Sequence, residues 1–173
     1  NQLLARLIEG HASSTVESAT IVMTSVADMV ASRLATGDTQ RLDALMTQSL
    51  PGLPFLRSIA LLDRQGRVVA SSSADDAGRT VPLQPLGVLP ALDRDAIGPL
   101  LRGRGLADLS GPRASTGIAF VPLLRRLSDG HGGTLLLVGL LNPDTFATYQ
   151  ASSLEGEPAG TWGMLTSYRG QVL

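Results

Sequence analysis

The fold of this chain depends most on one stretch, Phe55-Leu-Arg-Ser-Ile-Ala-Leu-Leu-Asp-Arg-Gln-Gly-Arg-Val-Val-Ala-Ser-Ser-Ser73, which predicts a β-hairpin. Two short apolar runs, 59–62 and 68–70, flank four residues with turn chemistry. Asp63 suits the first position of a type I turn, because its carboxylate can accept hydrogen bonds from the following backbone N–H groups. Gly66 suits the last position, where a left-handed φ is free only for glycine. An isolated hairpin is marginally stable in water, so the rest of the chain must supply more strands or a covering helix.

Residues 2 to about 36 are predicted to form one long helix, because apolar side chains recur there at three- and four-residue spacing. At 1.5 Å per residue the helix would be roughly 50 Å long, which is longer than a small domain is wide. Two interpretations remain open. The helix is either a dimerisation stalk that carries a signal to a membrane or an ordinary amphipathic helix packed on its own sheet. The two interpretations can also apply to different parts of the helix.

The remaining elements are predicted from apolar runs and from turn residues. Gly37 is expected to end the long helix, and Asp38 or Thr39 to cap a second helix. A short helix is expected over 92–101, capped by Asp93, and another over 146–151 after a start at 142–144. Strands are expected over 116–126, 134–141 and 161–168. This order predicts an α+β fold, with a mixed or antiparallel sheet of about five strands and helices on one side.

Composition excludes several classes of function. The 173 residues are 43% apolar, which is enough for one domain with a core. The formal net charge is −1, which argues against a nucleic-acid surface, because such a surface needs clustered positive charge. The absence of Cys excludes disulfides, a Cys-type zinc site and a thiol nucleophile. His11 and His131 are not spaced with other metal ligands, and no catalytic or phosphate-binding motif is present. We therefore expect no metal, no cofactor and no enzymatic activity.

The sequence also bears on location. No run of 18 apolar residues is present, so the chain is not expected to span a membrane. It begins without Met and ends where a strand is predicted, so we expect it to be a piece of a longer protein.

The order of the motifs resembles the Cache family, the PAS-like sensory domains found outside the membrane in bacterial receptors. Segment 59–69 resembles the first strand pair of the family, and 92–97 resembles its Asp-Arg-x-Tyr-Phe segment. The other matching segments are 109–127 with the third strand, 129–146 with the fourth strand and the following helix, and 162–173 with the closing strand pair.

The resemblance implies a long N-terminal helix packed on a PAS-like, five-stranded antiparallel sheet. Residues 1–50 would be a helical stalk with a second helix, and residues 51–173 the Cache sensor module, as one structural unit. The N-terminal helix would continue from a transmembrane segment and pair in a homodimer. The chain would then be the periplasmic portion of an inner-membrane receptor whose output is a histidine kinase, a diguanylate cyclase or a chemoreceptor. Its partner would be a small molecule such as a carboxylate or an amino acid.

Four residues are predicted to bind that ligand: Arg94, Asp95, Tyr149 and Trp162. Arg94 matches the Arg of the family motif, and its guanidinium suits a carboxylate through bidentate hydrogen bonds. A surface ion pair of Arg94 with Asp93 or Asp95, and core packing of the two aromatic side chains, are the alternatives.

The sequence departs from the family pattern at two places. Ala96 and Ile97 replace the two aromatic residues of the motif. Ser167 or Tyr168 replaces the acidic residue that often ends the last strand and would hold a ligand ammonium. A ligand-free dimerisation or protein-interaction module therefore stays open beside the sensor. The sensor predicts a pocket of a few hundred cubic ångströms, and the interaction module predicts a sheet face filled by Leu and Val.

Overall fold

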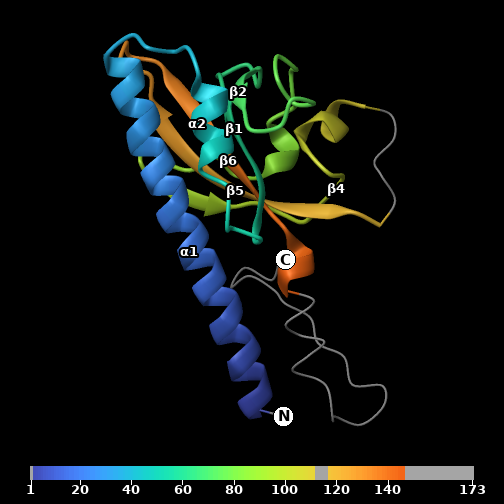
Figure 1. Cartoon of the computed structure of the whole chain (residues 1–173). Coiled ribbons are helices and arrows are strands. Elements are labelled where there is room, and N and C mark those ends of the chain that lie inside the picture. Colours follow the sequence, from blue (N-terminus) through green and yellow to red (C-terminus); the bar gives the residue numbers. More distant parts are fainter. Residues whose placement is uncertain (1, 112–116, 147–173) are drawn as a thin grey trace.

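The computed structural model describes residues 2–111 and 117–146, which form a central sheet with helices on one face and irregular chain on the other (Figure 1). The helices are α1 (Gln2–Ala35) and α2 (Leu42–Gln48). The strands are β1 (Leu56–Leu62), β2 (Val68–Ser71), β3 (Asp95–Ile97), β4 (Leu101–Arg102), β5 (Ala119–Ser128) and β6 (Thr134–Leu141). Two short 3-10 helices, η1 (Gln84–Leu86) and η2 (Leu106–Ser110), lie in the long connection between β2 and β5.

The six strands lie in the order β2-β1-β6-β5-β3, and β4 pairs with β5 beyond the end of β3. Every pair of these strands is antiparallel. The predicted α+β fold, with a long N-terminal helix and an antiparallel sheet of about five strands, is therefore confirmed. None of the helices in the described ranges combines the length and the hydropathy needed to cross a membrane.

The predicted hairpin is present as β1 and β2. Asp63 Oδ1 accepts hydrogen bonds from the backbone N–H groups of Gln65 and Arg67, both at 2.9 Å. Gly66 has a φ of +81° and donates its N–H to the carbonyl oxygen of Asp63 at 3.0 Å. The carboxylate and the left-handed glycine thus close the turn as their chemistry predicts.

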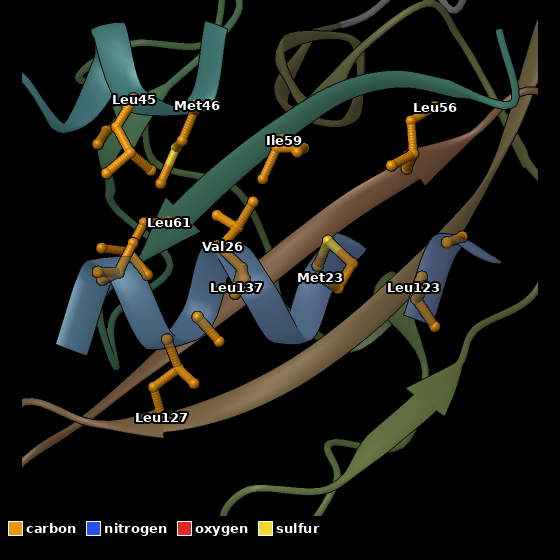
Figure 2. Packing of buried hydrophobic residues seen from close by; sticks show 14 of the residues in the cluster. Met23, Val26, Leu45, Met46, Leu56, Ile59, Leu61, Leu123, Leu127 and Leu137 are labelled. Atoms are coloured by element: carbon orange, nitrogen blue, oxygen red, sulfur yellow. The ribbon is translucent and has the colours of Figure 1, made fainter. Parts of the chain in front are cut away.

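The core between the helices and the sheet is built of Leu, Val, Ile and Met side chains (Figure 2). Met23 and Val26 of α1 and Met46 of α2 are buried against Ile59 and Leu61 of β1. The C-terminal half of α1 is thus an amphipathic helix packed on its own sheet. The N-terminal half runs on past the edge of the sheet (Figure 1), which leaves the stalk interpretation open for that part.

The opposite face of the sheet is covered by the connection between β2 and β5. Alternate residues of the strands, among them Ala60, Leu62 and Phe120, point to this side. Leu86 of η1 and Leu106 of η2 are fully buried on them. The connection is therefore a packed layer even though it contains few hydrogen-bonded elements.

The predicted helix over 92–101 is wrong, because this segment forms β3 and β4 on the edge of β5. Gly98 and Pro99 interrupt the segment, and Pro inside a helix removes a hydrogen bond and clashes with the preceding turn. A Cβ on Gly98 would lie 2.0 Å from the carbonyl oxygen of Leu86 and 2.6 Å from Pro122 Cγ, so only glycine fits this crossing. Asp93 has a φ of +55° and caps no helix.

The predicted cap of the second helix is also wrong. Arg41 occupies the N-cap position of α2 with a φ of 72°, and no side chain caps the helix. Asp38 instead accepts a hydrogen bond from Arg33 at 2.9 Å. The helix start predicted at 142–144 is confirmed, since residues 143–146 are helical. The rest of the helix predicted over 146–151 and the strand over 161–168 lie outside the described residues.

A candidate ligand-binding site

A polar cleft of about 560 Å³ opens beside the connection that covers the second sheet face. Its walls come from the N-terminal end of β1, the loop after β2, the η2 region, the residue before β5 and the helix start after β6. The residues that line it are Arg57, Ser58, Ser73, Asp75, Asp76, Arg104, Gly105, Ala107, Asp108, Ile118 and Asp144. The volume lies within the range typical of small-molecule sites.

A β-bulge places two neighbouring residues of β1 in the wall of the cleft. Leu56 pairs with Leu141 and Ser58 with Leu140, so Arg57 is the extra residue of β1. Successive side chains of a regular strand point to opposite faces, and a bulge breaks this alternation. Arg57 and Ser58 can therefore both line the cleft, while Leu56 stays in the core beneath α1.

The guanidinium of Arg57 is held by three partners. It donates to the carbonyl oxygen of Ala119 at 2.9 Å and to Asn142 Oδ1 at 2.6 Å. It also forms an ion pair with Asp144 Oδ2 at 3.6 Å. Arg57 thus ties the bulge in β1 to the start of β5 and to the residue after β6, which fixes the geometry of this wall.

Asp76 forms the floor of the cleft and is fully buried. Its Oδ1 accepts a hydrogen bond from the N–H of Ala107, in the first turn of η2, at 2.7 Å. Burial raises the pKa of the Asp76 carboxyl above its ordinary value of 3.8, against the lowering effect of the nearby backbone N–H groups of Ala107 and Leu106. The negative charges of Asp75 and Asp108 raise the pKa further.

Two buried polar atoms in the wall of the cleft have no hydrogen-bond partner among the described residues. They are Asp76 Oδ2 and Ser58 Oγ, and Ser58 is only 6% exposed. Most buried polar groups in proteins are hydrogen-bonded, so an exception calls for an occupant such as a water or a ligand. Both atoms can accept a hydrogen bond, which makes this floor the chemically unsatisfied part of the cleft.

The residues predicted to bind ligand lie elsewhere or outside the described part. Arg94 is exposed in the turn before β3, and both carboxylate oxygens of Asp95 on β3 accept hydrogen bonds from Arg125 Nη1, at 2.9 and 3.0 Å. Neither residue lines the cleft. Tyr149 and Trp162 lie outside the described residues, and the ligand-binding role of all four stays a prediction.

Sequence reasoning missed the cleft residues, although one signal was present. Arg57 and Ser58 are two polar residues at the start of a strand that is otherwise wholly apolar and buried. A strand buried on both faces leaves no solvated side for a polar pair, so such a pair needs partners inside the fold. Asp76 carried no signal, because an acidic pair in a loop is normally solvated.

A second surface is the groove between α1 and α2, with a volume of about 720 Å³. Apolar side chains are exposed along it: Ile21 of α1 is 70% exposed, and Met29 is 40% exposed. Neither the groove nor the cleft offers a metal centre, since no three His, Cys, Asp or Glu side chains in the described ranges converge as ligands.

Comparison with solved structures relates this fold to a known protein. The chain resembles the crystal structure of the extracellular domain of rpHK1S-Z16, a protein assigned as a histidine kinase, with a TM-score of 0.61 and 18% sequence identity. The two share this fold. The similarity covers 87% of this chain and 59% of the other, so the chain spans less than two thirds of that domain. No protein-family model and no curated protein matches the sequence.

Proposed function

We propose that this chain is the extracytoplasmic sensory domain, of the Cache type, of a bacterial membrane receptor. It would bind a small molecule in the polar cleft and pass the signal through α1 to a cytoplasmic kinase or cyclase. The observation that carries the proposal is a cleft with unsatisfied buried polar atoms, on a fold shared with the extracellular domain of a protein assigned as a histidine kinase. The chain itself would catalyse no reaction and would lie in the periplasm.

Strand β1 supplies a physical link between the cleft and α1. Ser58 lines the cleft, while Ile59 next to it and Leu56 before the bulge belong to the core that packs against α1. Met23 of α1 lies over Gly139 of β6, where an added Cβ would be 2.7 Å from Met23 Sδ and 3.2 Å from Leu56 Cδ2. Figure 2 shows Leu56, Ile59 and Met23 on the same side of the sheet. A ligand that moves β1 at Ser58 therefore changes the surface on which α1 rests.

The sensory function is tested by thermal unfolding of the chain with a broad panel of small metabolites. A ligand present at 100 times its Kd stabilises the native state by about 2.7 kcal/mol. For a domain of this size the expected rise in Tm is roughly 5–11 °C. Binding that survives Ser58→Ala and Arg104→Gln would place the ligand outside the cleft. A flat panel with a well-folded protein would refute the sensor and favour the ligand-free interaction module.

A homodimer through α1 is a second proposal, favoured by the exposed apolar side chains along the groove. Ile21 and Met29 are 70% and 40% exposed along the same groove, on the helix that runs past the sheet, and a contiguous exposed apolar patch is typical of an interaction surface. Sedimentation velocity should show a dimer whose Kd rises in Ile21→Ser. Val88→Ser is the matched control, because Val88 is 77% exposed but lies in the connection after η1. Equal effects of the two substitutions, or a monomer at all concentrations, would contradict the dimer.

A further inference from the structure

We propose that the floor of the cleft binds the protonated amine of a ligand, held by Asp76 and Ser58. This inference rests on the proposed sensory function and specifies the chemistry of the ligand at the same cleft. It assigns the two residues a role that differs from the carboxylate recognition predicted for Arg94.

The two unpartnered oxygen atoms of the floor can both accept a hydrogen bond from a donor. Asp76 Oδ1 is already used by the N–H of Ala107, whereas Asp76 Oδ2 has no partner among the described residues. Ser58 Oγ is also without a partner. An ionised carboxylate only accepts hydrogen bonds, and an alkylammonium group offers three donors and no acceptor. An ammonium group therefore matches the unmet acceptor capacity of the floor, and its three donors exceed the two unpartnered atoms.

The distribution of charge in the cleft favours the same ligand. Four of the lining side chains are carboxylates and two are guanidiniums. The guanidinium of Arg57 is occupied by Ala119, Asn142 and Asp144. Arg104 is exposed at the rim. The part of the cleft around Asp76 therefore carries uncompensated negative charge, contributed also by Asp75 and Asp108.

A cation at the floor also relieves the cost of burying Asp76. Removal of a carboxylate from water disfavours its charged form, and a positive charge within a few ångströms favours that form again. Burial is the largest cause of the raised pKa of Asp76, and no cation of the described residues is among the causes that act on it. An anionic ligand would instead add a like charge beside Asp76 and would be repelled.

The cleft has room for more than the amine. Its volume of about 560 Å³ exceeds that of an ammonium group, so an organic substituent can lie against the rest of the wall, including the aliphatic side chain of Ile118. A metal cation fits less well, since fewer than three acidic or histidine ligands converge among the described residues. The expected ligand is therefore a small organic amine.

The test compares amines with carboxylates of the same skeleton. The probes are propylamine against butyrate and phenylethylamine against 3-phenylpropionate, at millimolar concentration because ligands this small bind weakly. Thermal unfolding and calorimetric titration would be run on the full chain and on Asp76→Asn, Ser58→Ala and Asp38→Asn. Asn at 76 can still accept the hydrogen bond of Ala107, so η2 should remain anchored. Asp38 is exposed, lies outside the cleft and serves as the matched control.

The amines should raise Tm and the matched carboxylates should not. Asp76→Asn should weaken amine binding by a factor of about ten or more, since a hydrogen bond to a charged group is lost. Ser58→Ala should weaken it several-fold, and Asp38→Asn should leave it unchanged. If Asp76→Asn does not fold, Ser58→Ala alone decides the result.

Several outcomes would overturn the inference. They are the absence of any amine binding to the wild type, amine binding that neither Asp76→Asn nor Ser58→Ala weakens, and preferred binding of the carboxylates. Carboxylate binding that is lost in Arg104→Gln would leave the sensory function standing with a different ligand chemistry. The sensory function itself fails only if the broad metabolite panel is also flat.

Discussion

Gly66→Ala should destabilise the fold more than Gly78→Ala, although both glycines have a left-handed φ. Gly66 is buried with a φ of +81°, and its carbonyl oxygen accepts the N–H of Val81 at 2.8 Å. A Cβ at this position would lie 2.1 Å from the carbonyl oxygen of Val81, more than an ångström short of ordinary van der Waals contact. The atom in the way belongs to the backbone, so a side-chain rotation cannot relieve the overlap.

Three effects make up the magnitude. The left-handed conformation costs a residue with a Cβ about 1–2 kcal/mol. Displacement of the Val81 backbone loses a hydrogen bond worth about 1 kcal/mol. The overpacking around Val81, which is 1% exposed, adds about 1–3 kcal/mol. The expected loss in the free energy of unfolding is therefore about 3–6 kcal/mol, which corresponds to a fall in Tm of at least about 6 °C.

Gly78→Ala is the matched control for this prediction. Gly78 has a φ of +72°, is exposed, and has no atom within 4 Å of the position of a Cβ. Gly78→Ala should lower the free energy of unfolding only by the cost of the left-handed conformation, about 1–2 kcal/mol. Urea unfolding of both variants, followed by circular dichroism, gives the two losses. Losses that agree within about 0.5 kcal/mol would refute the argument that the Val81 carbonyl sets the cost at Gly66.

Three further substitutions test the packing and the charges. Met23→Ala should lower the free energy of unfolding, measured in urea, by about 2–5 kcal/mol, because Met23 is fully buried between α1 and the sheet. A smaller loss would show that the helix moves onto the sheet and fills the cavity. Asp95→Ala should lower the free energy of unfolding by about 1–3 kcal/mol, because it leaves the guanidinium of Arg125, whose side chain is 13% exposed, without its ion pair. Asp38→Ala breaks an exposed ion pair and should lower the free energy of unfolding by only about 0–1 kcal/mol. Burial raises the pKa of Asp76, so the native state binds the proton of this carboxyl more tightly than the unfolded state does. The wild type should therefore lose stability relative to Asp76→Asn as the pH rises from about 3.8 through the raised pKa. Denaturant titrations across that range would measure the difference, and a pH-independent difference would contradict it.

The elements predicted well from sequence are those whose pattern is local. The helix α1 repeats its apolar residues over many turns, and the first hairpin combines two apolar runs with Asp63 and Gly66 at the turn. These signals depend on dihedral preferences and on periodicity within one segment, so distant parts of the chain cannot reverse them easily.

The edge strands β3 and β4 could not be predicted in the same way. Each is two or three residues long, and each exists only because β5 offers an unpaired edge for hydrogen bonds. The apolar spacing of Ile97, Leu100 and Leu101 matches one helical turn as well as it matches this arrangement. Pairing with β5 therefore determined the conformation of β3 and β4. Gly98 and Pro99 were the local signal against a helix.

The fold could be predicted from the sequence, but the cleft could not. Arg57 lines the cleft because the strand gains one residue at the bulge, and a bulge depends on how β1 registers with β6. Asp76 is buried because η2, thirty residues further along, donates the N–H of Ala107 to it. The polar pair Arg57-Ser58 is the one local trace of the bulge, and the burial of Asp76 leaves none in its neighbouring residues. The unsatisfied oxygen atoms of Asp76 and Ser58 exist only once these distant segments meet, so the chemistry of the ligand is specified by the tertiary fold and not by any local motif.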